Sequence, residues 1–327
     1  MPKNLIDTGG RPLLDLTSYA RRGPGRRDHL SLAEIELIQR TVNRTPEVMV
    51  KVLTRGASTL KGVRAHVTYL NRGGVLEVET DEGEHLAGKA VAKRLLEDWD
   101  LDVEEHRRRA DLRPGKERAP PRFVHKILFS MPPGTPPKKV LEAVKNLARE
   151  EFALQHRYAM VLHTDEPHPH VHLVVKAVSE QGVRLNIRKD TLRRWRAEFA
   201  SHLRKLGVAA NATERAVRGE NRPPLRDPIY RAGRRGDSRV LNGRSVGNAE
   251  EGQPRSEGDT LRATRELVSR GWYGVQELLR ESGRADLAAQ VVAFLSRMPI
   301  SRSANELSID ELVQRRVART AEVYPER

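Results

Sequence analysis

The sequence predicts an α+β fold in which helices flank a central antiparallel β-sheet. Strand-like segments lie at residues 123–130, 158–165 and 171–178, and a helical segment over residues 136–152 separates the first from the second. Because only a short loop joins the second and third strand segments, we expect them to be antiparallel neighbours. Strands mixed with a packed helix in this way indicate a layered domain.

Further elements are expected on both sides of this centre. A helix over residues 32–42 follows Ser31, a residue type that is typical of helix caps. The others are a strand at residues 47–54, a helix from 58 or 59 to about 72, a strand at 75–79, a long charged helix at 89–111, an Arg-rich helix at 190–206, and helices at 261–270, 275–281, 286–298 and 308–322.

These segments group into four regions. Residues 1–45 are expected to form a basic N-terminal arm with a short helix, and the first thirty residues to be loosely ordered, because their Gly- and Arg-rich stretches cannot bury a core. Residues 46–220 are expected to form the main domain, 221–258 a linker rich in Arg, Gly and Pro, and 259–327 a small helical region.

Composition excludes several classes of protein. The 327 residues include no Cys, which excludes disulfides, thiolate zinc sites, Fe–S clusters and Cys nucleophiles. No apolar run approaches the roughly 20 residues of a membrane span, and the N-terminus lacks the apolar core of a signal peptide. We therefore expect a cytoplasmic protein that does not insert into membranes.

The charge of the chain is strongly positive and unevenly distributed. The net charge is +15, and residues 187–245 alone hold 16 Lys and Arg against 6 Asp and Glu. Fourteen of those 16 are Arg, whose guanidinium fork matches phosphate oxygens. The segment therefore indicates either phosphate contacts or a basic surface that only favours solubility.

Four of the 11 His fall within residues 163–172. His170 and His172 are two residues apart on an expected strand, so their side chains share one face. His163 closes the preceding strand, and a tight connection would return the chain beside that pair. We expect these three imidazoles to bind one divalent metal ion; a solvated His-rich loop or an adventitious metal binder is the alternative.

Two more residues of the cluster have open roles. Asp165 is expected either to orient a ligand imidazole or to accept a proton. His168 precedes Pro169 in the connection and is either a substrate contact or a bystander. Three His ligands suit zinc hydrolysis, oxygen chemistry or phosphoryl transfer. The Arg-rich segment downstream favours a nucleic-acid phosphodiester among these.

The pattern His-x-Asp-x-x-His-Pro-His-x-His at residues 163–172 resembles motif III of conjugative relaxases, the HUH endonucleases that nick plasmid transfer origins. Residues 66–74 (HVTYLNRGG) resemble motif I, which carries a nucleophilic tyrosine, and residues 127–135 (ILFSMPPGT) resemble motif II. Residues 211–219 (NATERAVRG) are similar to a segment that follows these motifs. The resemblance covers about residues 48–220 and is strongest to the P-type branch, which includes the relaxases of T-DNA transfer.

The resemblance implies the HUH relaxase fold and a site- and strand-specific DNA nicking–joining enzyme. Tyr69 would be its nucleophile, and the three histidines would hold Mg²⁺ or Mn²⁺, with Zn²⁺ as the alternative. It would cut a transfer origin by tyrosine transesterification, stay on the 5′ end, and initiate conjugation in a bacterial cytoplasm.

The same resemblance implies partners. These are single-stranded origin DNA, accessory relaxosome proteins, and the coupling protein of a type IV secretion system. Contacts to DNA are expected from ten polar or basic residues: Arg72, Ser130, His168, Lys176, Arg188, Lys189, Arg193, Arg194, Arg215 and Arg218.

Two other functions stay open. Because Tyr69 precedes the His cluster, the order favours a relaxase over an HUH replication initiator or transposase, in which the tyrosine generally follows. A non-catalytic DNA-binding mobilisation protein would keep Tyr69 in its core and the histidines as structural residues.

The chain also departs from the family pattern at Lys176, where an Asn is frequent.

Overall fold

The computed structural model describes residues 14–20, 27–53, 57–110, 121–219 and 256–298. They belong to two compact units, each considered by itself. We call residues 44–212 the sheet unit. Residues 14–43 together with those from 213 onward form the helical unit.

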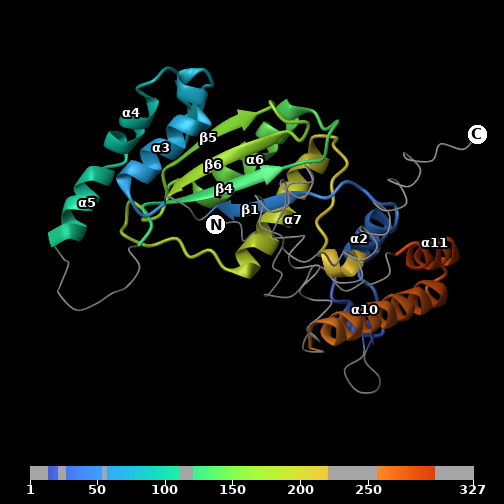
Figure 1. Cartoon of the computed structure of the whole chain (residues 1–327). Coiled ribbons are helices and arrows are strands. Elements are labelled where there is room, and N and C mark those ends of the chain that lie inside the picture. The colour runs from blue at the N-terminus through green and yellow to red at the C-terminus, as the bar shows by residue number, and fades with distance from the viewer. Residues whose placement is uncertain (1–13, 21–26, 54–56, 111–120, 220–255, 299–327) are drawn as a thin grey trace, which may run out of the picture. The chain divides into compact units, whose positions relative to one another are not determined.

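A six-stranded sheet forms the centre of the sheet unit (Figure 1). Its strands are β1 (Met49–Leu53), β2 (Val78–Thr80), β3 (His85–Leu86), β4 (Val124–Ser130), β5 (Tyr158–His163) and β6 (His170–Lys176). They lie in the order β1-β4-β6-β5-β2-β3, and each pair is antiparallel. The predicted antiparallel sheet flanked by helices is confirmed.

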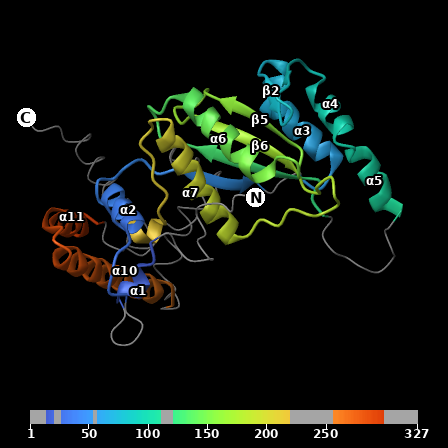
Figure 2. The same ribbon diagram turned by 180° about the vertical axis from the view of Figure 1, so that it is seen from behind.

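Helices cover both faces of this sheet. On one face α6 (Pro137–Phe152) and α7 (Lys189–Lys205) pack against alternate strand residues such as Phe129 and Leu173; Figure 2 shows both helices in front of the sheet. On the other face α3 (Leu60–Leu70), α4 (Val91–Asp98) and α5 (Leu101–Ala110) contribute to a second core with Val124, Val161 and Val174. Since successive strand residues point to opposite faces, the three central strands β4, β5 and β6 supply both cores.

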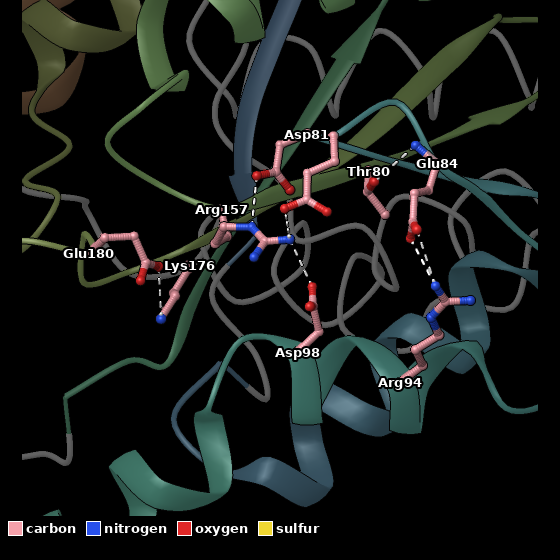
Figure 3. Close-up of polar contacts among 9 residues, drawn as sticks. Thr80, Asp81, Glu84, Arg94, Asp98, Arg157, Lys176 and Glu180 are labelled. Carbon is pink, nitrogen blue, oxygen red and sulfur yellow. Dashed lines mark hydrogen bonds and ion pairs between the residues drawn. The ribbon is translucent and has the colours of Figure 1, made fainter.

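Ion pairs tie the far edge of the sheet to α4. Arg157, just before β5, donates to Asp81 at 2.7 Å and to Asp98 at 2.8 Å (Figure 3). Arg94 of α4 reaches Glu84 in the β2–β3 turn. These contacts fix a hairpin that is too short to be stable alone.

Helices alone form the described part of the helical unit. It contains α1 (Leu16–Ala20), α2 (Leu32–Val42), the 3₁₀ turn η2 (Arg215–Arg218), α10 (Ser256–Glu281) and α11 (Ala285–Ser296). Ser31 caps α2 in a reciprocal capping box with Glu34, as predicted. The Tyr19 hydroxyl donates to Glu34 at 2.9 Å, and Arg27 pairs with the same carboxylate.

Four sequence expectations about these elements are wrong. Residues 14–20 are not loosely ordered, because Leu14, Leu16 and Tyr19 are buried in the core. The expected helix 89–111 is two helices, broken at Asp100, whose φ of +50° cannot continue a right-handed helix. The strand expected at 75–79 begins only at Val78, after a turn.

The fourth concerns residues 261–281, which form one helix through Gly271 and Gly274 instead of two. Both glycines lie where α1 approaches α10, so they permit close packing and do not end the helix. The expected helix at 308–322 and most of the expected linker lie outside the described residues.

Gly271→Ala is expected to destabilise the helical unit by about 1–3 kcal/mol. An added Cβ would lie 2.2 Å from the Leu16 carbonyl oxygen, so α1 would have to move. Without that contact the substitution would stabilise a helix by about 1 kcal/mol. The sign of the change in unfolding free energy therefore shows whether α1 packs against Gly271. Arg270→Ala, an exposed neighbour, is the control.

The buried His125 is expected to make the sheet unit less stable in acid. Its burial, together with Arg122 and Arg184, lowers its pKa to about 4. Above pH 6.5 the imidazole is neutral both folded and unfolded, so pH has no effect through it. Between pH 6.5 and 4 only the unfolded chain takes up the proton, so stability falls by up to about 3 kcal/mol.

Denaturant unfolding at pH 7 and pH 4.5 measures this loss. His125→Leu is expected to flatten the pH dependence in that interval. An unchanged slope in the variant would contradict the assignment.

Candidate metal centre and tyrosine site

Three imidazoles meet on the face of the sheet that also carries α3. In the register, His163 of β5 lies directly opposite His170 of β6, and His172 follows on the same face. Ring centroids are 5.2 Å apart for His163–His170, 4.8 Å for His163–His172 and 5.2 Å for His170–His172. The predicted return of the chain beside the His170–His172 pair is thus present.

Backbone carbonyls orient two of the rings. His163 Nε2 donates to the Leu70 carbonyl at 2.7 Å, which leaves the lone pair on Nδ1. His170 Nδ1 donates to the His168 carbonyl at 2.9 Å, which leaves the lone pair on Nε2. Partners of this kind fix the tautomer of a ligand imidazole. His172 Nδ1 is buried without a hydrogen-bond partner in the described part of the chain.

The donor set fits a divalent metal ion. One nitrogen of each ring lies within 4.8 Å of those of the other two, and ligands about 2.1 Å from one ion need to close to about 3.4 Å. Burial, opposed in part by the Leu70 contact, lowers the pKa of His163. Burial and the other imidazoles lower the pKa of His172 to about 3. Neutral imidazoles are the form that ligates metal.

Tyr69 lies beside this centre on the last turn of α3. Its ring centroid is 6.5 Å from that of His163, and its side chain is 57% exposed. The other side of the helix is buried through Val63, Val67 and Leu70. Tyr69 is therefore held near the imidazoles while its ring stays open to solvent.

A left-handed turn after α3 places Arg72. Asn71 caps the turn by accepting from Gly74 N and donating to the Gly88 carbonyl at 3.1 Å. Arg72 and Gly73 have φ of +54° and +68°. A Cβ on Gly74 would lie 2.6 Å from Gly88 C, so the two chain segments touch there. The Gly-Gly pair that follows Arg72 is needed for this close turn.

Arg72 joins the tyrosine to the cluster. Its guanidinium carbon lies 4.9 Å from the Tyr69 ring centroid, a cation–π contact. The same guanidinium pairs with Asp165 and lies 3.4 Å from His163 Nδ1. Asp165 lies beyond the end of β5, so the expectation that it shares the strand with His163 is wrong, and its carboxylate is 3.9 Å from His163 Nδ1.

The charge state of Asp165 follows from these contacts. Partial desolvation acts to raise the pKa of Asp165. A backbone hydrogen bond and the charge of Arg72 together lower that pKa by more, so the net shift is downward. The carboxylate is therefore ionised at neutral pH.

Of the expected DNA contacts, the structure brings Arg72 and Ser130 to the imidazoles. Ser130 ends β4 directly opposite His170. His168 is exposed in the β5–β6 connection, and its carbonyl supports His170. Lys176 lies at the other end of β6, paired with Glu180 (Figure 3).

Four expected contacts lie on or beside α7, which packs on the opposite face of the sheet: Arg188, Lys189, Arg193 and Arg194. Arg194 pairs with Glu151 and Glu198, and Arg193 with Asp190. Arg215 and Arg218 belong to the helical unit, where Arg218 donates to Thr213.

The sequence analysis missed His66. Its ring lies 6.2 Å from that of His172, edge to face, and its Nε2 is buried without a hydrogen-bond partner in the described residues. Burial, Lys126 and His163 lower the pKa of His66 to about 4. A signal was present, because His66 stands three residues before Tyr69 and residues at this spacing share a helix face.

Part of the chain matches a known protein family. Residues 76–208 match the family model "Relaxase: MobA/VirD2-like, nuclease domain". The match includes the three histidines and Asp165 but begins after Tyr69 and Arg72.

The chain is also similar to proteins named "T-DNA border endonuclease VirD2". The one from Agrobacterium fabrum is 27% identical over 211 residues, 60% of this chain and 46% of the relative. The one from Rhizobium radiobacter is 28% identical over 198 residues, 55% and 44% of the two chains. This chain thus aligns with less than half the length of these relatives. In the part of the chain that the structure describes, no helix is long and apolar enough to cross a membrane.

Proposed function

Because residues 76–208 match the nuclease domain of the MobA/VirD2-like relaxases, we propose that this chain is a relaxase of that kind, which nicks and rejoins one DNA strand at the transfer origin of a mobile element. The observation that carries the proposal is the exposed Tyr69 ring 6.5 Å from His163, on the face where three imidazoles meet. A phenol beside a cluster that can hold a cation suits attack on a phosphodiester.

The reaction exchanges one phosphodiester for another. Tyr69 Oη bonds to the scissile phosphorus as the bond from phosphorus to the 3′ oxygen breaks. The upstream strand leaves with a 3′-hydroxyl, and the 5′ phosphate stays on Tyr69. The phenolic proton passes to solvent, to which Tyr69 is open, and the leaving oxygen gains a proton in turn. Attack by the 3′-hydroxyl reverses every step and rejoins the strand.

The remaining groups bind and orient. His163, His170 and His172 would hold Mg²⁺ or Mn²⁺, or Zn²⁺, which three imidazoles intrinsically prefer. A bound ion supplies positive charge to the phosphate oxygens. Asp165 holds Arg72, and Arg72 presents its charge between Tyr69 and His163. In this role Asp165 is an orienting residue; proton acceptance is its alternative.

The proposal extends to partners and place. Single-stranded origin DNA is the substrate, and accessory relaxosome proteins and the coupling protein of a type IV secretion system would act with the enzyme in a bacterial cytoplasm. Conjugative transfer would begin with its nick.

Incubation with supercoiled origin plasmid and Mg²⁺, stopped with SDS and protease, tests the function. We expect relaxed plasmid with a peptide on the 5′ end, and primer extension then maps the nick. Plasmid that stays supercoiled with every metal tried would favour the non-catalytic mobilisation protein. Nicking confined to a replication origin or a transposon end would favour the initiator or transposase.

Arg72→Ala and Asp165→Asn are expected to slow nicking by about 10–100-fold each. Because both act through one ion pair, the double variant should be little slower than the slower single one. Single-turnover nicking rates of the four proteins measure this coupling. Additive losses would instead assign Asp165 a separate role in proton transfer. Arg64→Ala, an exposed change on α3, is the control.

A further inference from the structure

The side of the metal centre opposite Tyr69 carries two exposed side chains, Met49 and Lys51, that have no part in the proposed cleavage step. Two rows of paired residues cross the sheet there. One runs Met49–Ser130–His170–His163, and the other runs Lys51–Leu128–His172. We call Met49, Lys51, Leu128 and Ser130 the β1–β4 floor.

The strand pattern puts the floor on the same face as the imidazoles. Val50 and Val52 of β1 pack against the α6–α7 core. Met49 and Lys51 alternate with them along the strand, so their side chains lie on the opposite face, which also carries the imidazoles. Lys51 is exposed and the Met49 side chain is 41% exposed. An exposed cation and an apolar side chain thus stand beside the metal centre.

Distances along the rows are short. Neighbouring strands lie about 4.8 Å apart, so Lys51 Cα is about 10 Å from His172 Cα. A Lys side chain spans about 6 Å, which is long enough for its ammonium to reach the phosphate next to one bound at the metal centre. By contrast Lys189 begins α7, which packs on the opposite face.

The geometry of phosphoryl transfer indicates which DNA segment lies beside β4 and β1. Attacking and leaving oxygens lie roughly in line through phosphorus. Tyr69 and Arg72 lie on the His163 side of the cluster, so the leaving 3′ oxygen points across His170 toward β4 and β1. The upstream strand, which ends in the new 3′-hydroxyl, lies on that side.

Resting on the proposed nicking function, we propose that the β1–β4 floor binds the DNA segment upstream of the nick and retains it after cleavage. Lys51 contacts a backbone phosphate, Met49 packs against a sugar or base, and Ser130 lies between them and the scissile phosphate. The covalent link holds one product end, and the floor holds the other without a bond.

Binding to single-stranded oligo(dT) of 20 nucleotides tests the floor without cleavage. In a Tyr69→Phe background, Lys51→Ala is expected to weaken binding about 3–10-fold and to lower the salt slope by about 0.7. Lys51→Arg should restore most of the affinity. Lys205→Ala, an exposed charge at the end of α7, should change nothing. Unchanged binding by Lys51→Ala, or a larger loss for Lys189→Ala, would overturn the proposal.

Two oligonucleotides, one ending and one beginning at the mapped nick, then test whether the floor binds the DNA upstream or downstream of the nick. Lys51→Ala and Met49→Ser should lose affinity for the upstream oligonucleotide and not for the downstream one. In otherwise wild-type protein they should slow rejoining more than cutting. A loss confined to the downstream oligonucleotide would overturn the assignment of the strand. Absence of any covalent adduct with the wild-type protein would count against the nicking function, while the oligo(dT) result would still decide the floor.

Discussion

Tyr69→Phe is expected to abolish covalent attachment to DNA and to lower nicking by more than about 10³-fold. The change removes one hydroxyl and keeps the ring that contacts Arg72 and lies beside His163. Because the side chain is 57% exposed, little core packing is lost. Affinity for single-stranded DNA should stay within about twofold of wild type.

Denaturing gels with a 5′-downstream label detect the adduct, and filter binding gives the affinity. Tyr273→Phe, an exposed tyrosine of the helical unit, is the matched control and should nick normally. An adduct that persists in Tyr69→Phe would move the nucleophile to another residue.

His172→Ala has the second large effect. Removal of one of three ligands is expected to weaken Mn²⁺ binding by at least about 100-fold, measured by calorimetry without DNA. His170→Ala and His163→Ala should behave alike, since each ring offers one nitrogen to the cluster. DNA affinity should fall far less than nicking, because the cation acts on the charge that develops at phosphorus.

His168→Ala is the matched comparison. The residue is exposed, and its part in the centre is a backbone carbonyl that Ala retains. Metal affinity should therefore change by less than about threefold. If His168→Ala were as damaging as His170→Ala while His163→Ala were tolerated, the ligands would be His168, His170 and His172.

The sheet could be predicted because its strands are short apolar runs with clear ends. The closing position of His163 and the tight return to His170 were enough to bring three imidazoles together. Helix breaks were harder to predict. Asp100 has no local sequence signal as strong as Gly or Pro, and Gly271 looks like a breaker until its contact with the Leu16 carbonyl is seen.

Site residues that depend on tertiary pairing escaped prediction. Whether α7 faces the histidines cannot be read from its Arg content, since the face it covers follows from which side chains of β4 and β6 it packs on. Lys51 could be proposed as a DNA contact only once β1 was known to pair with β4. His66 has the spacing of a site residue, but its contact with His172 crosses from helix to strand.

The hydrogen bond from His163 to the Leu70 carbonyl has a kinetic consequence. It fixes the last turn of α3 to the sheet at the residue next to Tyr69. A DNA end attached to Tyr69, as we propose, would therefore be held at a fixed position. Its partner end on the same protein then meets it at an effective concentration of order millimolar. Under the proposed nicking function, resealing would thereby be unimolecular, and a foreign strand would have to compete against that local concentration to be joined instead.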